Sequence, residues 1–89
     1  MASEFDTVWS RIVNHAGEVF RQLRGAEFTY DVHGSSVIAS RTNRQLARSQ
    51  FEQAFARMPT AGPGALQDLQ GPSYLWAILS DSRISGNAP

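Results

Sequence analysis

The chain has 89 residues, of which 42% are hydrophobic and 18% are charged, and its eight arginines balance eight acidic residues. This length and composition predict one small globular domain rather than a disordered chain. The lack of cysteine excludes disulfides, thiolate zinc sites and thiol nucleophiles, and zero net charge removes any bulk attraction to nucleic acid or anionic membranes.

The first predicted element is an amphipathic helix. Ser3 and Asp6 have the spacing of a capping box, in which a hydroxyl caps the helix and a carboxylate three residues later returns the contact. An apolar stripe at helical period follows and consists of Phe5, Val8, Trp9, Ile12, Val13 and Ala16. We expect this helix to end near Ala16, where Gly17 suits a left-handed cap.

Three strands are predicted next. The least regular covers residues 19–24 and ends at the turn signal around Gly25. In the second, Phe28, Tyr30 and Val32 alternate with polar residues, as in a strand with one buried face. A tight turn at Gly34 leads into the third strand, over residues 36–40.

The second half of the chain predicts two helices. Residues 41–48 fit either a helix start or a loop with Leu46 turned inward. We favour the loop, followed by a helix that begins near Ser49, where a second capping box occurs, and stops at Pro59. Residues 60–64 have the composition of a loop. Residues 71–81 then form the most apolar window and predict a buried central helix. At about 11 residues it is shorter than the roughly 20 needed to cross a membrane.

These elements predict an α+β domain in the order α-β-β-β-α-α, with one three-stranded antiparallel sheet covered by about three helices. We expect the domain to span residues 1–84 and residues 85–89 to be a disordered tail. The N-terminus lacks a basic segment followed by an apolar run, so we expect a cytoplasmic protein without a membrane partner. The predicted core consists of Phe5, Trp9, Ile12, Val13, Phe28, Tyr30, Val32, Phe51, Phe55, Leu75, Ile78 and Leu79.

An α-β-β-β-α order resembles that of double-stranded-RNA-binding domains. The resemblance is confined to the order of elements, because the lysine-rich helix start that meets RNA in that family has no counterpart in a chain without lysine. Topology alone does not assign a function, since three-stranded sheets covered by helices serve many.

No motif predicts catalysis, a metal site or a cofactor. His15 and His33 lack a partner at metal-ligand spacing, the nucleophile pattern G-x-S-x-G is absent, and the glycines of residues 60–64 lack the lysine of a phosphate-binding loop. The acidic residues are scattered over cap and surface positions. We therefore expect a non-enzymatic protein that uses no cofactor.

Charge patterning carries the first functional hypothesis, a small nucleic-acid-binding module. No acidic residue occurs between Asp31 and Glu52, and arginines alternate there with hydrogen-bonding side chains. The predicted phosphate and polar contacts are Arg41, Thr42, Asn43, Arg44, Gln45 and Arg48. A solvated cationic surface, or arginine stems packed on the sheet, explains the same pattern.

Aromatic content carries the alternative, a protein-interaction module that acts as a homodimer or as a small partner subunit. Two Trp, two Tyr and five Phe exceed what a core of this size readily buries, and zero net charge favours association. Trp76 is the first candidate because Leu75, Ile78 and Leu79 already supply the core stripe of its helix. Phe51 and Phe55 are the other predicted interface residues.

Overall fold

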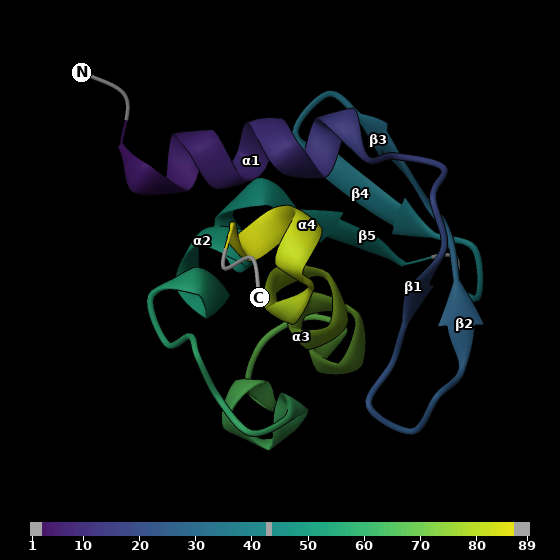
Figure 1. Cartoon of the computed structure of the whole chain (residues 1–89), viewed down its shortest axis with the longest axis vertical. Helices are drawn as coiled ribbons and strands as arrows, with labels where there is room; N and C mark the ends of the chain where they lie inside the picture. The colour runs from purple at the N-terminus through teal and green to yellow at the C-terminus, as the bar shows by residue number, and fades with distance from the viewer. Residues whose placement is uncertain (1–2, 43, 87–89) are drawn as a thin grey trace.

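The computed structural model describes residues 3–42 and 44–86, and within these it forms short helices and strands of an α+β fold. In chain order the elements are α1 (Glu4–Asn14), β1 (Phe20–Arg21), β2 (Glu27–Phe28), β3 (Tyr30–His33), β4 (Ser36–Ala39), β5 (Gln45–Ala47), α2 (Arg48–Phe55), the 3₁₀ helix η1 (Pro63–Leu66), α3 (Pro72–Ser80) and α4 (Ser82–Ser85). The predicted α+β class and the approximate order of elements are confirmed (Figure 1). α4 includes Ser85, the first residue of the expected tail, and residues 87–89 lie outside the described part.

The capping box at the start of α1 is present as predicted. The N–H of Asp6 donates to Ser3 Oγ at 3.1 Å, and the N–H of Ser3 donates to Asp6 Oδ2 at 3.0 Å. The helix buries Phe5, Val8 and Ile12. Val13 was wrongly assigned to the core, because its side chain is 43% exposed. At this turn of the helix Ile12 is the residue that points into the core. Val13 therefore lies at the edge of the apolar stripe.

The strands form two antiparallel sheets, β1-β2 and β3-β4-β5, where the sequence predicted one sheet. The run from Phe28 to Val32 is split, because Phe28 pairs with Phe20 in the smaller sheet whereas Tyr30 pairs with Ala39 in the larger. The third strand of the larger sheet is β5, which comes from the segment predicted as a loop or helix start. A three-residue strand with one buried side chain, Leu46, is too short to show alternation in the sequence.

α2 begins at Arg48, without the second capping box. Its N-cap is Ala47, and no side chain caps the helix. β5 therefore runs directly into α2, which leaves no loop between Gln45 and Phe55. The helix thus begins close to Ser49 as predicted, but the capping box is absent because Ser49 already lies inside the helix, where its spacing to Glu52 has no capping role.

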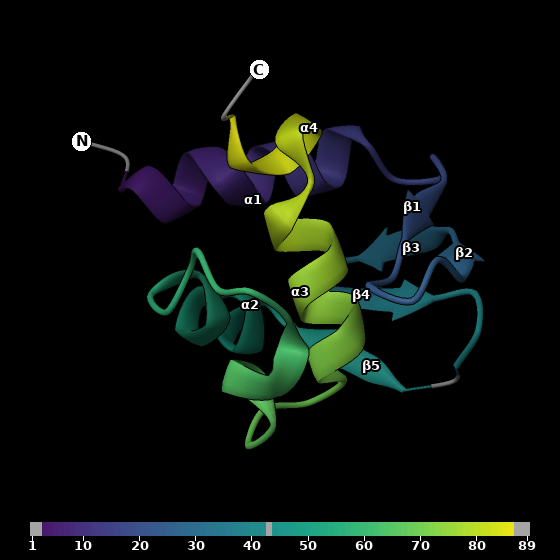
Figure 2. The same cartoon turned by 60° about the horizontal axis from the view of Figure 1, so that its bottom comes forward.

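The helices gather on one face of the larger sheet, with α3 in the middle of the molecule. Figure 2 shows α3 in front of this sheet, between α2 and the β1-β2 hairpin. On the covered face Tyr30, Val37, Ala39 and Leu46 are buried, whereas the neighbouring Asp31, Ile38 and Gln45 on the other face are not. The predicted central helix is confirmed, since α3 buries Leu75, Ala77, Ile78 and Leu79. None of the helices in the described part of the chain is long and apolar enough to cross a membrane.

Candidate binding surfaces

The predicted arginine segment divides between a turn, a strand and a helix. Arg41 and Thr42 lie in the turn after β4, where the N–H of Arg44 donates to Thr42 Oγ1 at 3.2 Å. Gln45 begins β5 and is exposed, and Asn43 lies outside the described residues. Arg41 and Arg44 are exposed, and neither forms an ion pair with any carboxylate in residues 3–42 and 44–86.

Arg48 is held by α1 and does not share the surroundings of the other two arginines. Its guanidinium forms an ion pair with Asp6 and lies 5.5 Å from the ring centroid of Phe5 and 5.7 Å from that of Trp9. The backbone N–H of Ser3 is the main cause that lowers the pKa of Asp6, and Arg48 lowers it further. Arg48 therefore joins α2 to α1, and its charge is already partnered.

The three predicted interface aromatics occupy different environments. Phe51 is completely buried and makes an edge contact with Trp9 at 6.0 Å between ring centroids, so its ring is not part of the surface. Trp76 is half-buried, and its indole N–H donates to the carbonyl of Thr60 at 3.1 Å. The sequence predicted that a partner protein would cover the Trp76 ring, whereas part of this ring is covered by the chain itself. Phe55 is half-buried and packs on Phe5, with 5.8 Å between ring centroids.

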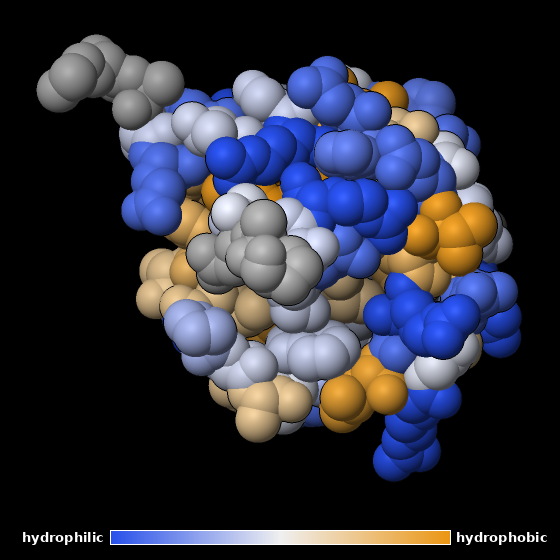
Figure 3. Space-filling view, viewed as in Figure 1, coloured by the Kyte–Doolittle hydropathy of each residue, from blue (hydrophilic) through white to orange (hydrophobic). Residues whose placement is uncertain are grey.

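Phe55 also lines a hollow of about 410 Å³ that we call the helix-end groove. It lies where α1 begins and where α2 and α3 end, and its lining residues are Glu4, Phe55, Met58, Pro59, Thr60, Leu79, Ser80 and Ser85. On the left side of Figure 3, hydrophobic side chains lie over the end of α2, below the hydrophilic start of α1. Sequence reasoning found Phe55 but missed the other lining residues, since four separate chain segments contribute to the groove and no local pattern connects them.

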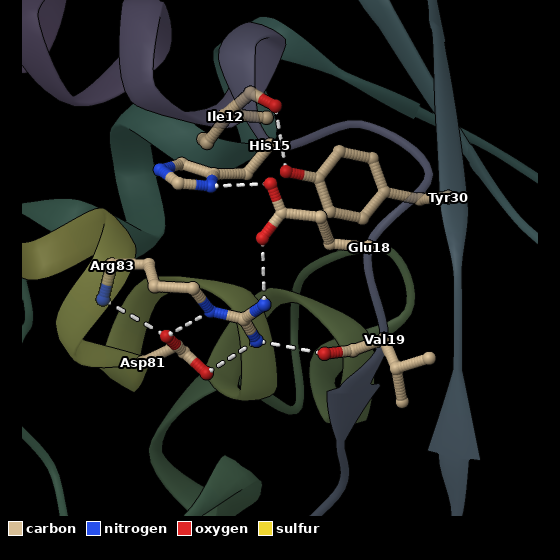
Figure 4. Close-up of polar contacts among 7 residues, drawn as sticks. All are labelled: Ile12, His15, Glu18, Val19, Tyr30, Asp81 and Arg83. Atoms are coloured by element: carbon tan, nitrogen blue, oxygen red, sulfur yellow. Dashed lines mark hydrogen bonds and ion pairs between the residues drawn. The ribbon is translucent and has the colours of Figure 1, made fainter.

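A polar cluster fastens α4 to the chain between α1 and β1 (Figure 4). Glu18 contacts His15 Nδ1 at 2.9 Å and Arg83 Nη1 at 3.0 Å. Arg83 also binds Asp81, donates to the carbonyl of Val19 at 2.8 Å, and lies 3.9 Å from the centroid of the Phe20 ring. His15 is the main cause that lowers the pKa of Glu18, and Arg83 adds to it. Every charged group of the cluster is thus partnered within it, so we assign the cluster a structural role, the attachment of α4.

Near this polar cluster, the hydroxyl of Tyr30 donates to the carbonyl of Ile12 at 2.6 Å, and burial raises the pKa of that hydroxyl. The bond satisfies a carbonyl in the last turn of α1 and joins the helix to β3.

No three of the His, Asp and Glu side chains in the described ranges are placed to hold a metal ion. Comparison with known proteins assigns no family: no protein-family model, no curated protein and no solved structure matches this chain.

Proposed function

We propose that the chain is a non-enzymatic protein-binding module whose helix-end groove receives a protruding segment of a partner protein. The observation that carries this proposal is the groove itself. Its volume of about 410 Å³ is large enough for several side chains, and Phe55, Met58 and Leu79 supply apolar walls. Sites of this kind gain affinity by removing apolar side chains of the partner from water.

The charges at the groove favour a partner segment that carries a lysine or arginine beside its apolar residues. Among the lining residues Glu4 alone is charged, and no cation in the described part of the chain pairs with it. Leu79 and Ser80 belong to the last turn of α3, where the helix dipole adds partial negative charge. A lysine or arginine of the partner, next to an apolar side chain that enters the groove, would interact with both the Glu4 carboxylate and the C-terminal end of α3.

A second copy of the chain fits the groove less well than a different protein does. In a two-fold dimer the contact is reciprocal, so each copy would have to place a protruding apolar segment of its own in the groove of the other. The exposed large apolar side chains Val13, Val19 and Leu23 do not line the groove. We therefore propose a small partner subunit or segment, rather than a homodimer, as the occupant.

The test is selection from a random peptide library displayed on phage. We expect the selected peptides to combine an apolar residue with Lys or Arg. Met58→Asp should weaken their binding at least about tenfold, because it brings an unpaired carboxylate against the apolar part of the peptide. Glu4→Gln should weaken binding by about two- to fivefold, and only for peptides that carry a cation. Fluorescence anisotropy with labelled peptides measures both effects.

Val13→Asp is the matched control, since it adds the same charge at an exposed apolar position outside the groove. Selected peptides that bind the Met58→Asp and parent proteins equally would refute the proposal. A dimer that light scattering detects in the parent and not in Met58→Asp would assign the groove to a second copy and contradict the heterologous partner.

A second candidate function, nucleic-acid binding, is favoured by one observation: Arg41 and Arg44 are exposed with their charges unpaired in the described structure. Gln45 is exposed beside them at the start of β5 and adds an amide for hydrogen bonding. Arg48 is left out of this smaller site because Asp6 already binds it. Two phosphate contacts support weak, salt-sensitive binding.

Binding to labelled single-stranded and duplex nucleic acid at low salt tests this candidate. We expect log K to fall against log salt with a slope of about −2, and the double change Arg41→Ala with Arg44→Ala to abolish binding without unfolding the domain. Arg21→Ala is the control, because Arg21 is paired with Glu27 on β2. The candidate fails if the parent binds no nucleic acid at low salt, or if the double variant binds as the parent does.

A further inference from the structure

A second hollow, which we call the hairpin groove, lies between the turn of the β1-β2 hairpin and the loop that leads into η1. Its volume is about 600 Å³, and its lining residues are Gln22, Leu23, Arg24, Ala61, Gly62, Pro63, Gly64, Gln67 and Ser73. Leu23 approaches the loop so closely that a Cβ on Gly62 would lie 3.1 Å from Leu23 Cδ2. The two walls of the groove therefore touch at this point, and a side chain at position 62 would displace Leu23 by a few tenths of an ångström.

The polar groups of the hairpin groove suit an anion. The lining residues supply the guanidinium of Arg24, the amides of Gln22 and Gln67 and the hydroxyl of Ser73, and no carboxylate is among them. Guanidinium groups bind carboxylate and phosphate oxygens through two parallel N–H donors, and amide and hydroxyl donors add neutral hydrogen bonds.

The acidic residues nearest in sequence to this groove are already partnered. Glu27, on the same hairpin as Arg24, pairs with Arg21 at 2.8 Å. Asp68, which follows Gln67, accepts from Arg57 at 2.6 and 2.9 Å, and these hydrogen bonds lower its pKa to about 2. Arg24 itself forms no ion pair within residues 3–42 and 44–86, so its charge remains available to a ligand.

The groove also has an apolar wall. Leu23 is 57% exposed, an unusual exposure for a large aliphatic side chain, and Pro63 faces the same hollow. Figure 3 shows hydrophobic and hydrophilic side chains side by side over the lower part of the β1-β2 hairpin. A ligand that places an apolar group on Leu23 would remove this surface from water while its anion reaches Arg24.

We propose that the hairpin groove binds a small organic anion, a carboxylate or phosphate monoester that carries an apolar group. Arg24 holds the anionic oxygens, the side chains of Gln22, Gln67 and Ser73 donate further hydrogen bonds, and Leu23 and Pro63 contact the apolar group. This site is independent of the helix-end groove, with which it shares no lining residue.

Titration of the ¹⁵N-labelled protein, followed by NMR, tests the proposal with benzoate and phenyl phosphate as the two anions and phenol as the neutral analogue. We expect both anions to shift the amide signals of residues 22–24, 61, 62, 64, 67 and 73, and phenol to bind at least about tenfold more weakly. The tighter of the two anions identifies the preferred head group. Arg24→Gln should weaken binding by about tenfold, and Leu23→Ser should weaken phenyl phosphate but not inorganic phosphate.

The double change Arg21→Gln with Glu27→Gln provides the control, since it alters the same hairpin outside the groove and leaves no unpaired carboxylate beside Arg24. It should leave the affinity within about twofold of the parent value, because the two removed charges were paired with each other. Three results would overturn the proposal: no saturable shift with either anion, equal binding of phenol and phenyl phosphate, or unchanged affinity in Arg24→Gln.

Discussion

Replacing Phe51 by alanine is expected to lower the free energy of unfolding by about 3–5 kcal/mol. The side chain has no exposed surface and fills the space between α2 and Trp9 of α1, so its removal leaves a cavity that rigid neighbours cannot close. A domain of this size has a total stability of only about 4–13 kcal/mol. Urea unfolding followed by tryptophan fluorescence and circular dichroism measures the loss.

Phe55→Ala is the matched control for this prediction, because it removes the same ring from the same helix at a half-buried position. We expect it to cost clearly less than Phe51→Ala, since Phe55 is already in contact with water and leaves an open groove rather than a closed cavity. An equal cost for the two variants would show that Phe51 is not the better packed ring and would contradict its completely buried position.

Replacing Gly71 by alanine is expected to lower the free energy of unfolding by about 2–5 kcal/mol, for two separate reasons. Gly71 has φ +49, a left-handed conformation that costs about 1–2 kcal/mol for a residue with a Cβ. The added Cβ would also lie 2.8 Å from Leu46 Cδ2, so the contact between the start of α3 and the edge strand β5 would have to shift, which costs about 1–3 kcal/mol.

Gly34→Ala separates the two reasons. Gly34 has φ +61, and an added Cβ would meet no atom within 4 Å, so this variant loses only the backbone term. Urea unfolding of both variants gives the packing term as their difference, which we expect to be at least about 1 kcal/mol. If Gly71→Ala costs no more than Gly34→Ala, Leu46 moves aside freely and the close approach between α3 and β5 has no energetic weight.

Several elements could be predicted from the sequence because their signals are local. The capping box at Ser3 and Asp6 and the apolar stripe of α1 need only neighbouring residues, and both are present. The central helix follows from an apolar window that is bounded by helix start and stop signals. Gly34 takes the positive φ that its hairpin turn requires. Local hydrogen bonding and helical period set these features before any distant contact forms.

The strands were harder to predict because their pairing is not local. Phe28 and Tyr30 lie two residues apart with the same alternation, yet they pair with different strands in different sheets. β5 owes its extended conformation to pairing with β4, where Leu46 lies opposite Val37. A segment of three residues has little intrinsic preference, so its partner decides its structure.

The candidate sites divide in the same way. The spacing of Arg41, Arg44 and Arg48 predicted one cationic surface, and a sequence shows which charges are close along the chain. It does not show that Asp6, 42 residues away, takes up the charge of Arg48. The two grooves depend still more on the tertiary structure, since their walls come from segments that meet only in the folded domain.

The sequence by itself thus determined the α+β class, the start of α1 and the buried character of α3, because capping groups and apolar periodicity act over a few residues. Tertiary structure alone decided which aromatic rings are enclosed, which arginines keep an unpaired charge and where the surface is hollow. These properties are set by contacts between distant residues, and each such contact forms only when the packing of the whole domain offsets the entropy lost in closing the chain between them.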